Sequence, residues 1–568
     1  MDGDTVRINE KVTKQTWLCL YVVIIMGGFL RFLNLNWDHG FMYNPDEMNI
    51  LMAVSRISFF DQMDPGFYAY NGFPIHLYKI IGSLIAYVWQ DPNWSHELAK
   101  LALVSRYTSA SLSLCSIYLM FLIGRRLFGN TGGILTAFFM ATSVGLIQAA
   151  HYGTTETLLV FFLCGMILES LRLLQKREVL FRDGVMTAIY LGLAVGTKTT
   201  ALSFLLIPII TVIILLRYKK LTFRKATWVS FGVLFIATGI FVTVSPFTLI
   251  HFGIFLKTMV YESGVTSGQI QVPYTVQFQQ TVPYVYQLRN LPWMTSLGVA
   301  WGGMIGSVIW FREQIKKWQQ VSLGEIPTLL PLMVFSLVYF AYIGQWYAKF
   351  IRYLVLMIPF LCLSMVYLIE KVPNGLTFRC IHRLMGSLIV IFSMVWALAF
   401  ASIYMNLNTR TQAKQWIYQN IAPGQVLIGE HYDYLLPGPY TGMSSQQYQH
   451  RVLHNFDPDS EAKKILIAET LAEGDYLILS SRRLWGTISR VPELYPMTSR
   501  YYELLFSGEL GYSIVKEFSS YPRLGRFIIH DDVAEETFQV FDHPVVYIFV
   551  NKKGLTRGDL AAILSATD

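Results

Sequence analysis

Two adjacent carboxylates, Asp46 and Glu47, lie just beyond the first long apolar segment of the chain. If the first apolar segment runs outward, both carboxylates lie at the depth where a lipid headgroup arrives, which suggests chemistry on a lipid-linked substrate. The same stretch also fits a helix start, because Asn44 can cap a helix, Pro45 suits its first turn and Glu47 can complete a capping box. The two interpretations are compatible. We expect Glu47 to fold back on the cap, which leaves Asp46 freer to meet a substrate.

Composition places these carboxylates in an integral membrane protein. Of 568 residues, 53% are hydrophobic and 14% are charged, which is far too apolar for a soluble protein of this size. Residues 1–404 hold 30 Lys and Arg against 18 Asp and Glu, whereas residues 405–568 hold 15 against 19. The basic residues fall in short clusters between apolar runs, so they indicate loops at membrane spans and not a nucleic-acid surface.

Eleven apolar runs predict eleven membrane-spanning helices. They cover, approximately, residues 17–35, 99–123, 131–150, 155–174, 185–197, 200–216, 228–247, 291–311, 326–344, 351–369 and 384–404. The first run has no small-residue cleavage site, so we expect a retained helix with its N-terminus in the cytoplasm. Alternating the runs then puts every short Lys/Arg-rich loop inside, as the positive-inside rule requires. We expect residues 45–57 and 73–89 to be helices lying in the membrane interface.

An odd number of spans leaves the end of the chain outside. The fold class we predict is a multi-pass α-helical membrane protein with a transmembrane domain, 1–404, and an extracytoplasmic α/β domain, 405–568, in the plasma or inner membrane. Short β-rich runs in the second domain predict its strands. They are residues 426–428, 476–479, 512–515 and 545–549. No cysteine follows position 380, so this domain cannot hold a disulfide.

Glu430, His431 and Asp433 form a polar group in the predicted exported domain. Carboxylates and a histidine this close together can carry chemistry. A solvated loop explains them more simply, and we expect no catalytic residue in this domain.

Further charged residues collect on the same outer side as Asp46. They are Arg31, His151, Glu156, Lys198, Lys349 and Arg352, with Tyr353 beside the last. Charges at membrane depth usually face a cavity or a partner. Lys349 and Arg352 are three residues apart, as on one helical face, and with Lys198 they could hold a phosphate. For any single one, an interfacial anchor or a structural ion pair explains it as well, and Arg31 can snorkel to the headgroups.

This layout resembles the GT-C glycosyltransferases of the protein O-mannosyltransferase and aminoarabinose transferase superfamily. The resemblance rests on the Asp46-Glu47 pair in a first outer loop with interfacial helices, on Arg31, and on three short motifs at 151–156, 196–199 and 349–353. It implies an enzyme that takes a sugar from a polyprenyl-phosphate carrier and transfers it on the outer or lumenal face. The chain lacks the trefoil insert of the eukaryotic mannosyltransferases.

The mechanism we expect uses Asp46 to orient or deprotonate the acceptor hydroxyl, with Glu47 beside it as a second catalytic candidate. The cationic residues then stabilise the departing lipid phosphate, which needs no protonating acid. They are Lys198, Lys349 and Arg352. The expected partners are a polyprenyl-phosphate sugar donor and a lipid, glycan or protein acceptor. We expect no required cofactor, because no carboxylate cluster is typical of a metal cage.

Two alternatives belong to other classes of protein. A transporter or flippase for a polar lipid would also need charges around a cavity. The chain shows neither internal repeats nor paired broken helices, and a transporter has no obvious use for an exported domain of roughly 165 residues. An inactive scaffold of the same fold is the other alternative.

Overall fold

The computed structural model of the chain shows two compact units. It describes residues 11–320, 325–371, 376–440 and 442–565. The helical unit comprises Met1–Asn36, Asn44–Ser263 and Val282–Ala401. The sheet unit comprises Trp37–Tyr43, Gly264–Thr281 and Ser402–Asp568. Two segments from the first 404 residues therefore belong to the sheet unit, and the division of the chain at residue 404 stays a prediction.

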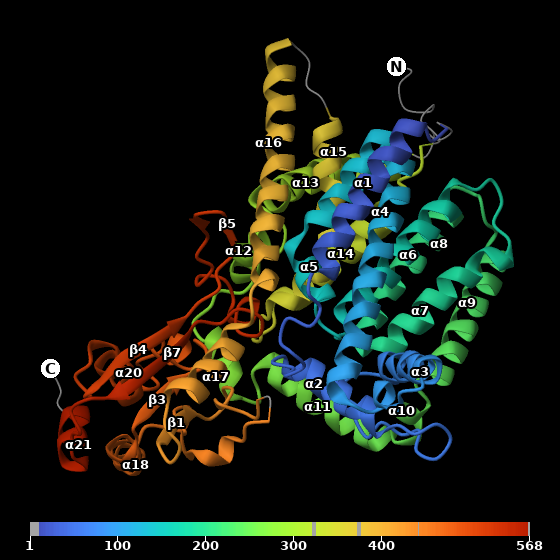
Figure 1. The fold of residues 1–568 in the computed structure, drawn as a ribbon. Helices are drawn as coiled ribbons and strands as arrows, with labels where there is room; N and C mark the ends of the chain where they lie inside the picture. Colours follow the sequence, from blue (N-terminus) through green and yellow to red (C-terminus); the bar gives the residue numbers. More distant parts are fainter. Residues whose placement is uncertain (1–10, 321–324, 372–375, 441, 566–568) are drawn as a thin grey trace. The chain divides into compact units, whose positions relative to one another are not determined.

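Most helices of the helical unit follow the predicted apolar runs, whereas α2, α3 and α11 lie outside those runs (Figure 1). They are α1 (Lys14–Phe32), α2 (Pro45–Arg56), α3 (Gly72–Trp89), α4 (Leu98–Thr142), α5 (Val144–Ala150), α6 (Glu156–Gln175), α7 (Val185–Thr197), η4 (Thr199–Leu205), α8 (Leu206–Arg217), α9 (Phe223–Val244), α10 (Pro246–Ile250), α11 (Phe252–Ser267), α12 (Val285–Met294), α13 (Leu297–Gln319), α14 (Leu330–Gly344), η7 (Ile351–Met357), α15 (Ile358–Glu370) and α16 (Leu376–Ala401). Within the described residues, seven helical segments are long and apolar enough to cross a membrane. The multi-pass helical fold class is confirmed, and the number of eleven spans stays a prediction.

The range given for α4 contains two helices that meet at a sharp turn at Gly129. Gly129 has a φ of 79° and a ψ of −170°, a conformation that residues with a side chain rarely adopt. A Cβ on Gly133 would lie 2.9 Å from the Cβ of Arg125, and one on Gly124 would lie 2.3 Å from the Thr136 hydroxyl. The segments on either side of Gly129 therefore pack against each other as a hairpin.

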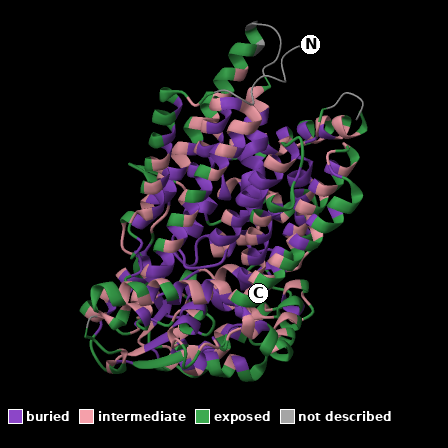
Figure 2. Cartoon of the chain, turned by 90° about the vertical axis from the view of Figure 1, so that its right-hand side faces the viewer, coloured by how far each residue is buried: buried purple, intermediate pink, exposed green. Residues whose placement is uncertain are grey.

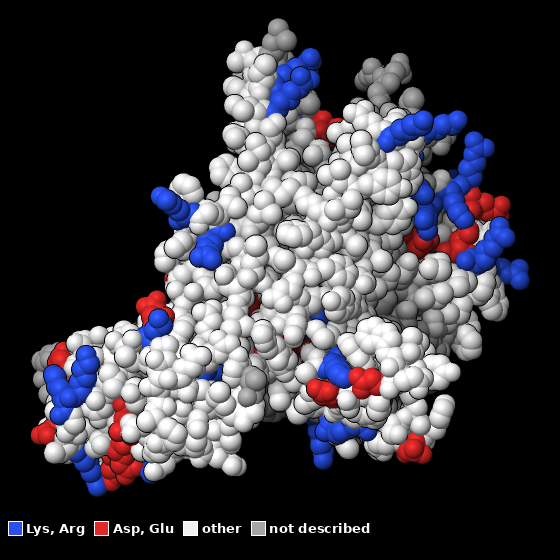
Figure 3. All heavy atoms as spheres, viewed as in Figure 1, with Lys and Arg blue, Asp and Glu red and all other residues white. Residues whose placement is uncertain are grey.

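The helices differ in how much of their surface other helices cover (Figure 2). α6 is buried along most of its length, whereas α9 exposes large apolar side chains such as Trp228, Phe231 and Phe235. An exposed apolar helix surface is stable where it meets lipid. Figure 3 shows an uncharged band across the middle of the helical unit, with Lys and Arg gathered at the upper end of the view, over the start of α16 and the α8–α9 connection.

The stretch between the first two predicted spans forms two helices, α2 and α3, at one end of the bundle (Figure 1). Asn71 holds the start of α3, because its Nδ2 donates to the Val195 carbonyl oxygen at 2.6 Å. The Gly72 amide donates to the Ser245 hydroxyl at 2.7 Å. The far half of α3 exposes Leu84 and Trp89. This pattern fits a helix lying in the interface, and that position stays a prediction.

The sheet unit contains a five-stranded mixed sheet in the order β2-β1-β3-β7-β4. The strands are β1 (Val426–Glu430), β2 (Gln449–Leu453), β3 (Tyr476–Leu479), β4 (Tyr512–Phe518) and β7 (Val546–Asn551). β1 runs parallel to β2 and β3, and β7 is antiparallel to β3 and β4. The helices of the unit include η8 (Ser402–Met405), α17 (Thr409–Asn420), α18 (Glu461–Glu473), α19 (Trp485–Ile488), α20 (Pro496–Ser507) and α21 (Arg557–Ser565). The α/β character predicted for this part is confirmed.

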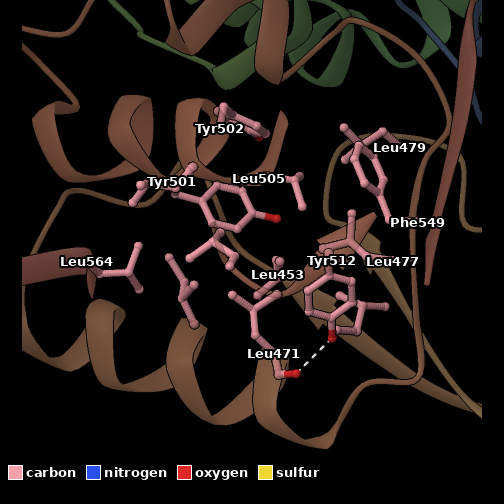
Figure 4. Close-up of a cluster of buried hydrophobic side chains, with 14 of the residues drawn as sticks. Leu453, Leu471, Leu477, Leu479, Tyr501, Tyr502, Leu505, Tyr512, Phe549 and Leu564 are labelled. Atoms are coloured by element: carbon pink, nitrogen blue, oxygen red, sulfur yellow. Dashed lines mark hydrogen bonds between the residues drawn. The ribbon is translucent and has the colours of Figure 1, made fainter. Parts of the chain in front are cut away.

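Both faces of this sheet are covered because its strands are apolar on both sides. Ile417 of α17 packs with Leu427 and Ile548 on one face. The other face packs against α18, α20 and α21 (Figure 4). There the Tyr512 hydroxyl donates to the Leu471 carbonyl oxygen at 2.7 Å. The four predicted strand runs all lie in or overlap strands, whereas β2 was missed because its Gln, His and Arg are exposed at the sheet edge.

Candidate active site

The helix start predicted around Asp46 is present. The Asn44 side-chain oxygen accepts hydrogen bonds from the amides of Asp46, at 3.0 Å, and of Glu47, at 3.4 Å. Pro45 occupies the first turn of α2. The cap fixes the backbone of both acidic residues and leaves their side chains to separate contacts.

Asp46 forms an ion pair with Arg352, 306 positions away in the chain. Their side chains are 23% and 28% exposed, so the pair is open at one side. Phe350 lies under the Arg352 guanidinium, with its ring centroid 4.9 Å from Cζ. Arg352 Nε is buried and has no hydrogen-bond partner in the part of the chain that the structure describes. The site therefore holds a cation with unused donor capacity beside an accessible carboxylate.

A second ion pair, Lys198 with Glu156, completes the group of charges. Lys198 follows the last turn of α7, and its Nζ lies 3.7 Å from Glu156 at the start of α6. The same Nζ lies 5.1 Å from the Tyr70 ring centroid and 6.0 Å from that of Tyr353. Glu156 also interacts electrostatically with Arg352, so the two pairs belong to one cluster.

Glu262 of α11 adds a third carboxylate to this cluster. Burial, and after it the charge of Asp46, raises the pKa of Glu262, whereas Arg352 and Lys198 lower it. Three carboxylates thus face two cations and two tyrosine rings. In the described residues no group of three His, Cys, Asp or Glu is arranged to hold a metal ion.

Glu47 has a different environment from its neighbour. It forms an ion pair with Arg106, at 2.6 Å, and both side chains are fully buried. Its other oxygen accepts from Arg106 Nε at 2.8 Å and from the Gly153 amide at 2.7 Å. The expectation that Glu47 folds back on the helix cap was wrong, because a buried guanidinium and an amide bind its carboxylate instead.

Comparisons with known proteins extend this description. Residues 98–249 match the family described as dolichyl-phosphate-mannose-protein mannosyltransferase. The archaeal oligosaccharyltransferase AglB from Archaeoglobus fulgidus, solved with an inhibitory peptide and a dolichol-phosphate, aligns with a TM-score of 0.53. The sequences are 13% identical, and the match covers 86% of this chain and 72% of AglB. The likeness to AglB shows that the two chains share a fold.

Two other GT-C structures align at TM-scores too low to support an inference. ArnT from Cupriavidus metallidurans, bound to undecaprenyl phosphate, gives 0.45 at 12% identity, over 98% of this chain and 100% of ArnT. The protein O-mannosyltransferase Pmt1-Pmt2 complex of S. cerevisiae, bound to the sugar donor, gives 0.32 at 15% identity, over 48% of this chain and 38% of the matched chain. No curated protein sequence matches the chain.

Two predicted site residues, Arg31 and His151, have structural contacts. Arg31 is fully buried, and it donates to the Ala141 and Met140 carbonyl oxygens, both at 2.9 Å, near the end of α4. Snorkelling to the headgroups was therefore the wrong expectation, because carbonyl groups at a helix end offer a cation better partners. His151 is also buried, with its ring nitrogens 2.8 Å from the Ile147 oxygen and 3.0 Å from the Leu33 oxygen.

Lys349 does not share a helical face with Arg352. η7 begins at Ile351, after Lys349, so the spacing of three residues has no helical geometry there. Lys349 is 4% exposed, and its Nζ donates to the Tyr347 carbonyl oxygen at 2.9 Å. The helical argument for a joint phosphate site was wrong, and the role of Lys349 at the donor stays a prediction.

Sequence reasoning missed three residues that the structure brings into these contacts. Arg106 interrupts the apolar run 99–123, and a charge inside a predicted span was a signal that it had a partner. Tyr70 and Glu262 lie in loops between spans, where nothing in the sequence separates them from other polar residues. Their positions depend on the tertiary fold.

The polar group of the sheet unit is not the solvated loop that the sequence suggested. Asp433 forms an ion pair with Arg410 at 3.1 Å, with both side chains 3% exposed. Glu430 is 2% exposed and accepts a hydrogen bond from the Tyr502 hydroxyl at 2.6 Å. Burial raises the pKa of the Glu430 carboxyl to about 8. The expectation was wrong for both carboxylates, because residues of the core bind them, and it holds only for the exposed His431.

Proposed function

We propose that the chain is a GT-C glycosyltransferase that transfers a sugar from a polyprenyl-phosphate donor to an acceptor hydroxyl on the extracytoplasmic face of the membrane. The Asp46–Arg352 pair is the observation that supports it best. It joins a partly exposed carboxylate to a guanidinium whose Nε has no partner in the described part of the chain. A carboxylate suits the acceptor hydroxyl, and a planar guanidinium suits phosphate oxygens.

In this proposal the donor phosphate replaces Asp46 as the partner of the Arg352 guanidinium. Phosphate oxygens bind Arg352 and Lys198, which releases Asp46 from its ion pair to orient the acceptor hydroxyl or accept its proton. The oxygen of the acceptor attacks the anomeric carbon, and the carbon–oxygen bond to the lipid phosphate breaks. The phosphate leaves as an anion without protonation, so one carboxylate is enough, whereas a glycoside hydrolase uses two.

The orientation we propose puts the N-terminus in the cytoplasm and residues 405–568 outside. The support is the distribution of charge, since Lys and Arg cluster in the short loops that alternate with the outer ones. A reporter that is active only outside the cytoplasm, fused after Asp568, is expected to be active. Activity of a cytoplasm-only reporter at the same position would reverse the orientation.

The function is tested with the purified full chain in vesicles that contain a polyprenyl-phosphate sugar. A transferase releases the lipid phosphate and glycosylates the acceptor, whereas a flippase moves the intact donor across the bilayer. Asp46→Asn is expected to stop the release. Asp61→Asn, which changes an exposed carboxylate of the same outer loop, is the matched control and is expected to leave it unchanged. Movement of intact donor without release would favour the flippase.

A further inference from the structure

A small hairpin of the sheet unit carries exposed apolar residues. Its strands, β5 (Arg523–Leu524) and β6 (Phe527–Ile528), form a two-stranded sheet of their own. Leu524, Phe527 and Ile528 are 42%, 81% and 56% exposed. Three large apolar side chains within five residues form a patch of the kind that marks an interaction site on a water-exposed domain.

The apolar residues lie on both faces of the hairpin. Leu524 pairs with Phe527 across the two strands, and Arg523 pairs with Ile528. Because successive residues of a strand point to opposite faces, the Leu524–Phe527 pair lies on one face and Ile528 on the other. The core of the domain therefore covers neither face of the hairpin, whereas it covers both faces of the main sheet.

Hydrogen bonds hold the hairpin beside the end of a membrane helix. The Arg523 amide donates to the Ser402 hydroxyl at 3.1 Å, and its guanidinium donates to Asn406 Oδ1 at 3.3 Å. Ser402 directly follows Ala401, the last residue of α16, whose apolar length suits a membrane span. Met405, in the same short segment η8, is 70% exposed. The hairpin is thus bonded to the segment that directly follows α16 in the chain.

Two arginines accompany the apolar residues. Arg526 lies in the turn of the hairpin and Arg523 at its start, and both are exposed. Figure 3 shows Lys or Arg at the surface where Figure 1 labels β5. Arginine at an interface binds lipid phosphates while neighbouring apolar side chains lie in the hydrocarbon, and anionic lipids strengthen this attraction.

We propose that the β5–β6 hairpin anchors the sheet unit to the membrane surface. Leu524, Phe527 and Ile528 enter the edge of the hydrocarbon region, and Arg523 and Arg526 bind lipid phosphates. The proposal requires that α16 spans the membrane, and it does not depend on sugar transfer.

The test measures the depth of the hairpin in the full chain, with its five cysteines replaced, in nanodiscs of phosphatidylcholine and phosphatidylglycerol. A nitroxide is attached to Phe527→Cys, or to Leu466→Cys as the control, since Leu466 is 48% exposed on α18. Oxygen concentrates in the bilayer and a nickel chelate stays in water. The ratio of oxygen to nickel collisions is expected to be several-fold higher at position 527 than at 466.

Two other outcomes would overturn the anchor. Equal ratios at the two positions would place the hairpin in water. An immobile label at 527 that neither reagent reaches would show that a protein surface, such as a second copy of the chain, covers it. Arg526→Gln is expected to lower the ratio at 527 in discs with phosphatidylglycerol and to change it little in pure phosphatidylcholine. An unchanged ratio in both would remove the arginine from the proposal.

Discussion

Asp46 and Glu47 are neighbours in the chain, yet their carboxylates have opposite environments. Each forms an ion pair with an arginine from a distant helix. The pair of Asp46 is about a quarter exposed, and the pair of Glu47 is fully buried. A partly exposed pair is held less firmly than a buried one and can exchange partners with a ligand, whereas breaking a buried pair leaves a bare charge in the interior. Successive residues of a helix are rotated by about 100°, so the Asp46 carboxylate is available for chemistry whereas the Glu47 carboxylate has a structural role.

The largest expected effect concerns catalysis. Asp46→Asn keeps the size of the side chain and removes its charge, so we expect transfer to fall by roughly 10²- to 10⁴-fold, the range of general-base and orientation effects. The melting temperature of the purified protein should change little. Turnover in vesicles and thermal unfolding are measured together. Near-normal turnover would remove Asp46 from the mechanism.

The buried pair should show the reverse pattern. Glu47→Gln leaves Arg106 without a counter-charge, and we expect a loss of about 3–5 kcal/mol in the free energy of unfolding. The double variant Glu47→Met/Arg106→Met should recover part of this loss, because no lone charge remains. Thermal unfolding and yield measure both. A stable Glu47→Gln protein without transfer would instead assign Glu47 to catalysis.

The cations test the phosphate side of the site. Arg352→Ala should weaken donor use by about 1.5–3 kcal/mol, the value of a charged hydrogen bond, and Arg352→Lys should weaken it less. Lys198→Ala should act on the same step. KM for the donor is the measurement, and Arg289→Ala, at an exposed arginine, is the control. If all three variants kept normal donor dependence, the phosphate would bind elsewhere.

The last expected effect, the smallest for each unit of pH, involves a buried carboxylate to which no arginine of the described residues is bonded. The pKa of Glu430 is raised to about 8 from 4.5, so the folded state keeps a proton that the unfolded state releases. Stability should therefore fall as the pH rises from 4.5 to 8, by at most about 1.4 kcal/mol per pH unit. Glu430→Gln should flatten this slope in thermal unfolding measured across that range. A slope as steep as that of the unmodified protein would contradict the assignment.

The sequence predicted the kinds of element better than the contacts within them. Apolar runs and β-rich runs showed where helices and strands lie, because burial against lipid or a core determines residue type. The predicted membrane topology was enough to place Glu156, Lys198 and Arg352 on the same side as Asp46. The pairing of each carboxylate with its arginine depends on how each helix is rotated and on where the side chains point. The spacing of residues in the sequence shows neither.

Arg31 has a consequence for how the protein is made. Its partner Ala141 lies 110 residues further along the chain. At about 5–20 residues per second, the ribosome needs on the order of ten seconds to synthesise that stretch. Until then the Arg31 guanidinium of α1 lacks these two carbonyl partners, because their residues have not been synthesised. We therefore expect α1 to reach its final position only after the turn at Gly129 has formed and the second part of α4 has packed against the first.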